Sequence, residues 1–127
     1  MKIFEKNYNG KFVTKYEANN LNSFRSIFEF LNLIRSKKYN FSNVEFMDTD
    51  NSADDGNETF NIDINNFDYD VIEKKYNSYN ISAVGIDIII KDIILSVLVS
   101  KNYEITVISY ENSRELLKKF EQDMKLL

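Results

Sequence analysis

Hydrophobic and polar residues alternate with two different periods along the chain, and each period predicts a type of element. Residues 2–17 alternate on either side of Asn9-Gly10, a dipeptide that suits a type I′ turn because both central positions adopt positive φ. Residues 81–110 contain successive alternating runs rich in isoleucine and valine. These patterns predict an N-terminal β-hairpin and a C-terminal antiparallel meander. Parts of the meander are apolar on both faces, which predicts one central strand covered on both sides.

Residues 21–38 show the spacing of a helix that faces a core. Apolar side chains recur there at i, i+3, i+4 and i+7, and Asn20 or Asn22 stands where a cap would begin the helix. The pattern therefore predicts an amphipathic helix.

Residues 112–126 predict a second amphipathic helix, with Asn112 as its cap. Within it, Glu121 and Lys125 stand at the i, i+4 spacing of a favourable ion pair.

The middle of the chain is less regular. Residues 41–47 and 58–64 alternate over short runs and predict two strands. Residues 66–79 roughly fit a helical period with Asn66 or Asp68 as a cap, although asparagine and tyrosine are weak helix formers. No linker rich in proline, glycine or serine divides the chain. The sequence predicts a single α+β domain over 1–127, in which an antiparallel sheet, built from the hairpin and the meander, is packed with two or three helices.

Composition removes several classes of chemistry. The 127 residues include no histidine and no cysteine, so thiol nucleophiles, Ser-His-Asp catalysis and zinc sites with soft ligands are excluded. The three glycines, Gly10, Gly56 and Gly85, are too few and too scattered for a phosphate-binding loop or a dinucleotide motif. A pair of carboxylates for glycoside hydrolysis stays open, but nothing marks a particular pair. We expect a protein without enzymatic activity and without a cofactor.

Charge is distributed unevenly. Residues 39–73 contain ten acidic residues and no lysine or arginine, whereas the other 92 residues hold ten acidic and sixteen basic residues, a net charge of +6. We call residues 39–73 the acidic segment. Such an asymmetry bears on partners and encounter rates, not on fold. Since the basic residues elsewhere are thinly spread, we expect no direct nucleic-acid binding.

The centre of the acidic segment, "MDTDNSADDGNE", is open to three interpretations: a divalent-cation loop, a docking surface for a basic protein, or a solvated turn. Its spacing partly fits an EF-hand calcium loop, but Ala53 stands where glycine is needed and Thr59 where a bidentate glutamate is needed. A looser cation site stays open. The candidate residues for a docking surface are acidic, because carboxylates attract a basic partner. One tyrosine is included, because tyrosine is enriched at interfaces. The first choices are Asp48, Asp50, Asp54, Asp55 and Glu58, and the second choices are Asp68, Tyr69 and Asp70.

The chain resembles the small cytosolic immunity proteins that bacteria make against their own toxins. The resemblance rests on the acidic segment, the abundant asparagine and tyrosine, the lack of histidine and cysteine, and an α+β pattern without a catalytic motif. It implies a non-enzymatic inhibitor that binds and neutralises a cognate toxin. The alternatives are a phage-type inhibitor of a host defence nuclease and a divalent-cation-binding module that uses the 48–58 loop.

We expect the protein to be cytoplasmic and not to associate with a membrane. The N-terminus lacks the uninterrupted apolar core of a signal peptide, and the most apolar stretch is short and broken by Lys91 and Asp92. An exposed edge of the 81–110 meander could also pair two copies into a dimer.

Overall fold

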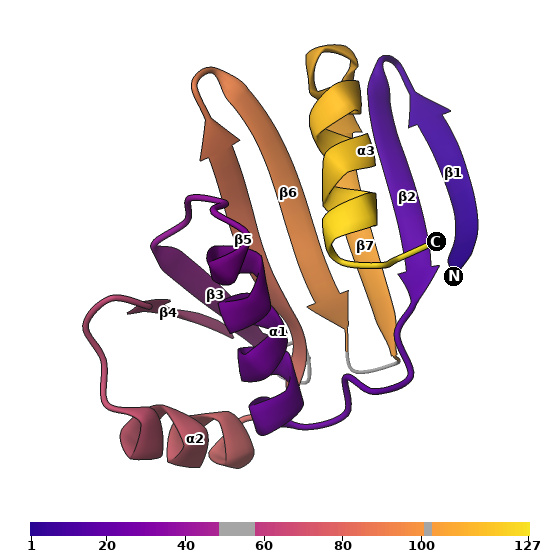
Figure 1. The fold of residues 1–127 in the computed structure, drawn as a ribbon. Coiled ribbons are helices and arrows are strands. Elements are labelled where there is room, and N and C mark those ends of the chain that lie inside the picture. The colour runs from indigo at the N-terminus through magenta and orange to yellow at the C-terminus, as the bar shows by residue number, and fades with distance from the viewer. Residues whose placement is uncertain (49–57, 101–102) are drawn as a thin grey trace.

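The computed structural model describes residues 1–48, 58–100 and 103–127 (Figure 1). In chain order they form β1 (Lys2–Tyr8), β2 (Lys11–Glu17), α1 (Phe24–Ser36), β3 (Asn43–Asp48), β4 (Glu58–Asp63), α2 (Tyr69–Ser78), β5 (Ile81–Ile90), β6 (Ile93–Ser100), β7 (Glu104–Tyr110), the 3-10 helix η1 (Glu111–Ser113) and α3 (Arg114–Asp123). None of the helices in these ranges is long and apolar enough to cross a membrane.

The described strands form one antiparallel sheet in the order β1-β2-β7-β6-β5-β3-β4. The predicted hairpin is confirmed as β1–β2, and its turn residues Asn9 and Gly10 both have positive φ, 53° and 83°. The predicted meander is confirmed as β5–β6–β7. The two units join because β2 pairs with β7, from Lys11 opposite Tyr110 to Glu17 opposite Glu104. The α+β fold class is therefore confirmed.

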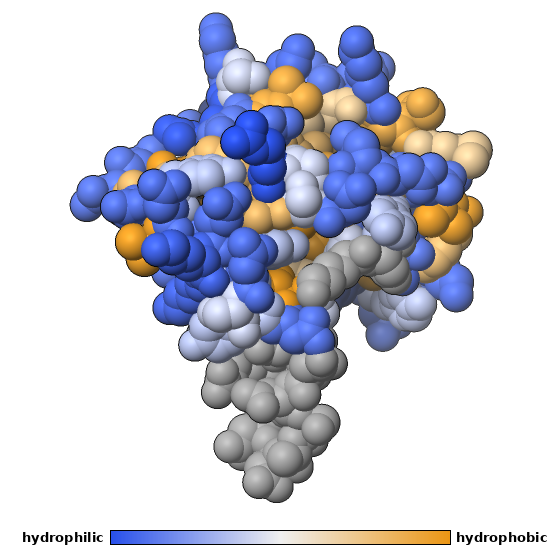
Figure 2. Space-filling view, turned by 90° about the horizontal axis from the view of Figure 1, so that it is seen from below, coloured by the Kyte–Doolittle hydropathy of each residue, from blue (hydrophilic) through white to orange (hydrophobic). Residues whose placement is uncertain are grey.

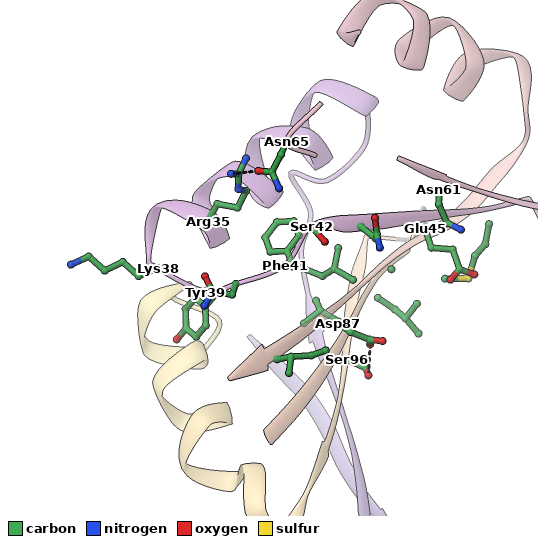
Figure 3. Close-up of a pocket in the computed structure, with 18 residues that line it drawn as sticks. Arg35, Lys38, Tyr39, Phe41, Ser42, Glu45, Asn61, Asn65, Asp87 and Ser96 are labelled. Atoms are coloured by element: carbon green, nitrogen blue, oxygen red, sulfur yellow. Dashed lines mark hydrogen bonds between the residues drawn. The ribbon is translucent and has the colours of Figure 1, made fainter. Parts of the chain in front are cut away.

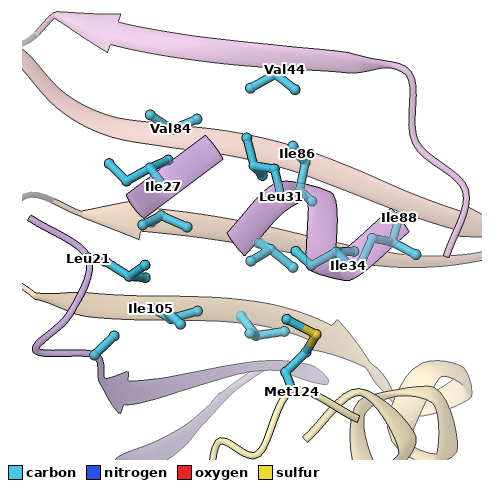
Figure 4. Close-up of a cluster of buried hydrophobic side chains, with 14 of the residues drawn as sticks. Leu21, Ile27, Leu31, Ile34, Val44, Val84, Ile86, Ile88, Ile105 and Met124 are labelled. Carbon is cyan, nitrogen blue, oxygen red and sulfur yellow. The ribbon is translucent and has the colours of Figure 1, made fainter. Parts of the chain in front are cut away.

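The three helices lie on the same face of the sheet (Figure 1). Helix α1 crosses in front of β5, α3 lies in front of β7, and α2 lies at the end of the molecule beside α1. The core fills the space between the helices and the sheet. In Figure 4 Ile27, Leu31 and Ile34 of α1 face a row of β5 side chains, including Val84 and Ile86. Burying each such side chain contributes about 1.5–3 kcal/mol.

The helix starts correct two of the predicted caps. Helix α1 is capped by Ser23, whose hydroxyl accepts a hydrogen bond from the backbone N–H of Ser26, and not by Asn20 or Asn22. Asn112 lies within η1 and does not cap α3. The reason is local: the chain makes a 3-10 turn before α3, and the Ser113 hydroxyl closes that turn by accepting from the N–H of Tyr110 and donating to its carbonyl oxygen.

The end of α3 corrects another prediction. Lys125 follows the helix with a positive φ of 54°, so it does not stand one turn beyond Glu121 on a continuous helix. Glu121 is 5% exposed and faces the sheet instead of solvent. The predicted Glu121–Lys125 pair is therefore wrong.

The second face of the sheet carries no helix within the described ranges, so the central strand is not covered on both sides as predicted. On β6, Val97 and Val99 are buried against the helices, whereas Leu98 is half-buried and Ile94 is 41% exposed on the other face. Leu98 is shielded within the sheet itself. A Cβ on Gly85 would lie 2.9 Å from Met47 Cε and 3.1 Å from Leu98 Cδ2, so these two side chains close over the glycine.

Candidate functional site

The acidic segment begins in the loop after α1 and runs through β3 and β4 into α2. The predicted pair of strands is confirmed: Asn43 lies opposite Asp63, and the backbones of Asp48 and Glu58 lie opposite each other at the far end of the pair. Asp50, Asp54 and Asp55 lie outside the described residues. The strand pair forms one edge of the described sheet, so the backbones of Asp48 and Glu58 lie at that edge.

Asp68 has a structural task. Its side-chain oxygen Oδ1 accepts hydrogen bonds from the backbone N–H of Asp70 at 3.0 Å and of Val71 at 3.3 Å. It thereby caps α2, as the sequence predicted for the ambiguous segment 66–79, which is confirmed as helical. Its carboxylate is nevertheless exposed, as is that of Asp70 in the first turn of the helix.

Tyr69 belongs to an aromatic cluster between α1 and α2. Its ring centroid lies 5.2 Å from that of Phe24 and 5.1 Å from that of Phe28. Tyr76 extends the cluster at 5.1 Å from Phe24, and burial raises its pKa. Tyr69 is half-buried, so its larger part packs the two helices together and a smaller part faces solvent.

Ion pairs gather at the opposite end of the sheet. We call β1, β2 and α3 the paired end, because the described ion pairs each include at least one residue from it: Lys2–Glu5, Lys2–Glu121, Lys15–Glu104 and Arg114–Glu5. The carboxylates of the acidic segment form no ion pair within the part of the chain that the structure describes. This holds for Glu45, Asp63, Asp68, Asp70 and Glu73.

A polar network lies beneath α3 at the paired end. The Tyr16 hydroxyl donates to Glu121 Oε2 at 2.6 Å, and Lys2 Nζ lies 3.1 Å from the same oxygen. Burial, together with the hydrogen bond to Glu121, raises the pKa of Tyr16, so its hydroxyl stays protonated. Arg114 donates to Glu5 at 3.0 Å, which lowers the pKa of Glu5. The network joins the first strand to the last helix, and we interpret it as structural.

A concavity of about 780 Å³ lies on the open face of the sheet and is lined in part by the acidic segment (Figure 3). The concavity forms where β3 and β5 separate. The pairing of the two strands ends at Glu45 opposite Gly85. Further along β5, Ile89 N donates to Asn40 O, in the loop before β3, at 3.4 Å. Polar side chains surround it. They include Arg35, Asn43, Glu45, Asn61, Asn65 and Asp87.

Two hydrogen bonds order the rim of the concavity. Arg35 donates to Asn65 Oδ1 at 2.7 Å, and Ser96 donates to Asp87 Oδ1 at 2.7 Å (Figure 3). Sequence reasoning missed this site, since its residues come from separate elements. The isolated Gly85 inside an apolar strand was a signal that a side chain closely approaches the backbone there.

The end of the molecule that carries α2 has a mostly hydrophilic surface with scattered apolar side chains (Figure 2). Among the described residues, no group of three or more His, Cys, Asp or Glu side chains could hold a metal ion. The predicted cation loop falls mainly on residues 49–57, outside the described ranges.

Compared with known proteins, the chain matches no family model, no curated protein and no solved structure.

Proposed function

We propose that this chain is a non-enzymatic inhibitor that binds a protein with a basic surface through its acidic segment, as an immunity protein binds a toxin. One observation carries the proposal: the described carboxylates of the acidic segment have no cation partner, while Glu5 and Glu121 at the paired end do. A surface of unpaired carboxylates attracts a basic protein and raises its rate of association.

The unpaired carboxylates lie on two neighbouring parts of the surface. Glu45 and Asp63 project from the β3–β4 pair on the open face of the sheet, and Asp70 lies on the exposed first turn of α2. Their exposure means that a partner can approach them without unfolding any element. Hydrogen bonds to charged groups become stronger once water is displaced, so pairing at such a surface contributes affinity as well as rate.

Affinity capture from a lysate of the source organism tests the proposal, with mass spectrometry to identify what binds. One variant neutralises three exposed acids of the segment: Glu45→Gln, Asp63→Asn and Asp70→Asn. A matched control makes the same change of net charge with exposed acids outside the segment: Glu17→Gln, Glu111→Gln and Glu115→Gln. We expect the first variant to lose the wild-type protein's basic partner and the control to retain it. Equal capture by both variants would contradict the proposal.

The loop between β3 and β4 is tested separately. Neutralising Asp48, Asp50, Asp54, Asp55 and Glu58 should slow association with the purified partner and flatten its dependence on salt. Unchanged rates across a salt series would remove the loop from the binding surface.

The captured partner also separates the alternatives. If the captured partner is a toxin, the result supports an immunity function. If it is a nuclease of a host defence system, the result supports a phage-type inhibitor. The cation-binding alternative is tested by calorimetry with calcium, in which heat of binding would support it.

A further inference from the structure

Strand β4 forms an edge of the sheet that pairs with no second strand among the described residues. It pairs with β3 on one side and ends the strand order on the other. Its residues Thr59, Asn61 and Asp63 are exposed, and Phe60 and Ile62 face the helices. An unpaired edge presents free N–H and C=O groups that can pair with another extended chain.

The register identifies which backbone groups are free. Ile64 N donates to Ser42 O at 2.7 Å, so Ser42 and Ile64 form a hydrogen-bonded pair at the end of the ladder. In an antiparallel ladder, hydrogen-bonded and non-hydrogen-bonded pairs alternate. Phe60 and Ile62 therefore direct their backbone groups to β3, while Thr59 and Asn61 direct their N–H and C=O groups to the free edge. Asp63 directs its N–H there as well, but its carbonyl oxygen already accepts from Asn66 N at 3.0 Å.

The opposite edge of the sheet is protected, and β4 is not. Strand β1 carries Lys2 and Lys6, and its register with β2 shifts between Lys2 and Phe4. Edge lysines and irregular register both hinder the addition of a strand. Strand β4 has neither lysine nor proline, and its register with β3 is continuous from Glu58 to Asp63.

We propose that β4 receives an extended basic segment of the partner as an added strand, which rests on the proposed function and specifies how its acidic surface binds. Charge favours this occupant. On the open face the added strand would run beside Asn61 and Asp63. Glu45 lies one strand further in, opposite Asn61 (Figure 3). Alternate residues of a lysine- or arginine-rich segment would face the carboxylates of Asp63 and Glu45.

The other side of the added strand would meet an apolar neighbour. Phe60 is half-buried, stacks on Phe46 at 4.8 Å, and lies under Lys75, whose Nζ is 4.4 Å from its ring centroid. Lys75 disfavours another cation there, so apolar residues suit this face. The recognised segment should therefore alternate basic with apolar residues, because successive side chains of a strand point to opposite faces.

A second copy of this chain is a poorer occupant. Pairing β4 with β4 would bring together two acidic segments, each with ten carboxylates and no cation. Like charges side by side on paired strands are destabilising.

Amide hydrogen exchange with a synthetic peptide tests the added strand directly. The probe is a short peptide that alternates lysine with valine, and the controls are a peptide of the same composition with its lysines grouped and one that alternates glutamate with valine. We expect the alternating lysine peptide to slow exchange of the Thr59, Asn61 and Asp63 amides about tenfold or more at saturation, as pairing of a free amide requires. Slowing by the grouped peptide to the same extent would overturn the proposal.

A substitution at Asn61 separates strand addition from simple charge attraction. Asn61→Pro removes an outward N–H without breaking the β3–β4 ladder, since proline is tolerated on an edge strand. Asn61→Thr loses the same amide side chain but keeps the N–H. We expect Asn61→Pro to bind the alternating lysine peptide about tenfold more weakly than Asn61→Thr, which corresponds to the loss of one hydrogen bond of about 1.4 kcal/mol.

The outcomes distinguish the two proposals. If both Asn61 variants bind alike while the neutralised acidic variant loses its partner, the protein-binding function stands and the added strand is wrong. If the neutralised variant and its matched control capture the same partner equally, the acidic surface itself is wrong. If the chain self-associates without peptide and Asn61→Pro abolishes this, a second copy is the occupant and the proposal is overturned.

Discussion

The two ends of the sheet differ in whether their carboxylates are paired with cations. At the paired end, carboxylates of β1 and α3 bind Lys2, Tyr16 and Arg114, so charge joins the first strand to the last helix. In the acidic segment at the other end, the described carboxylates face solvent or cap a helix, without a cation. Charges that stabilise a fold are neutralised within it, whereas charges left unpaired remain available to another molecule. We therefore assign a stabilising role to the ion pairs of the paired end, and a binding role to the unpaired carboxylates of the acidic segment.

The largest expected effect of this difference is at Glu121. Glu121→Ala should lower the free energy of unfolding by about 3 kcal/mol, because it leaves the buried Tyr16 hydroxyl and Lys2 without their shared acceptor. Urea unfolding at neutral pH measures the loss. Glu121→Gln is the matched control, since its amide oxygen can still accept from Tyr16, and it should lose less. Equal stability of Glu121→Ala and the wild type would show that the paired end is not what holds α3.

A smaller effect is expected at the start of α2. Asp68→Ala should cost about 1 kcal/mol, because the N–H groups of Asp70 and Val71 lose their capping oxygen. Asp70→Ala is the control, since Asp70 is exposed in the same turn and contributes only about 0.3 kcal/mol through the helix dipole. Thermal unfolding compares the two. A larger loss for Asp70→Ala would mean that Asp68 is not the structural acid of this pair.

A still smaller effect on stability is expected when the pH is lowered and the Glu5–Arg114 ion pair at the paired end is lost. Arg114 lowers the pKa of Glu5 in the folded chain, so the contribution of this ion pair is present above the unfolded pKa of glutamate and is lost as the pH falls through the folded pKa. Glu5→Gln should therefore lower stability at neutral pH by less than about 1 kcal/mol and should match the wild type at low pH. Urea midpoints across an acid series check this. A difference that stays constant with pH would contradict the ion pair as its cause.

Local patterns predicted the elements well, and long-range contacts explain what they missed. The Asn9-Gly10 hairpin and the stripe of α1 are set by neighbouring residues, so they could be predicted from the sequence. The pairing of β2 with β7 could not, because it joins residues about ninety positions apart in the chain. The burial of Glu121 follows from that pairing, since it brings Tyr16 beneath α3.

The candidate site could also be predicted only where it depends on composition or on neighbouring residues in the chain. Charge counting located the acidic segment from composition alone. It could not show that Asp68 caps a helix or that Tyr69 packs between Phe24 and Phe28, because these roles depend on neighbours in space. The free edge of β4 also depends on the strand order, which places the β3–β4 pair at the end of the sheet.

The smallest expected effect on stability belongs to the exposed acids Glu45, Asp63 and Asp70 of the acidic segment, and it is the sharpest test of the comparison. The variant Glu45→Gln, Asp63→Asn and Asp70→Asn should change the free energy of unfolding by less than about 0.5 kcal/mol, as is usual for exposed positions. At low salt its stability should rise relative to the wild type, because removing like charges relieves repulsion that salt otherwise screens. The Asn side chain at position 63 can still accept from Asn65 N, so the turn after β4 is preserved. Urea unfolding at low and high salt measures both quantities. A loss as large as that of Glu121→Ala would mean that these carboxylates stabilise the fold, and the acidic segment would then be no more available to a partner than the paired end.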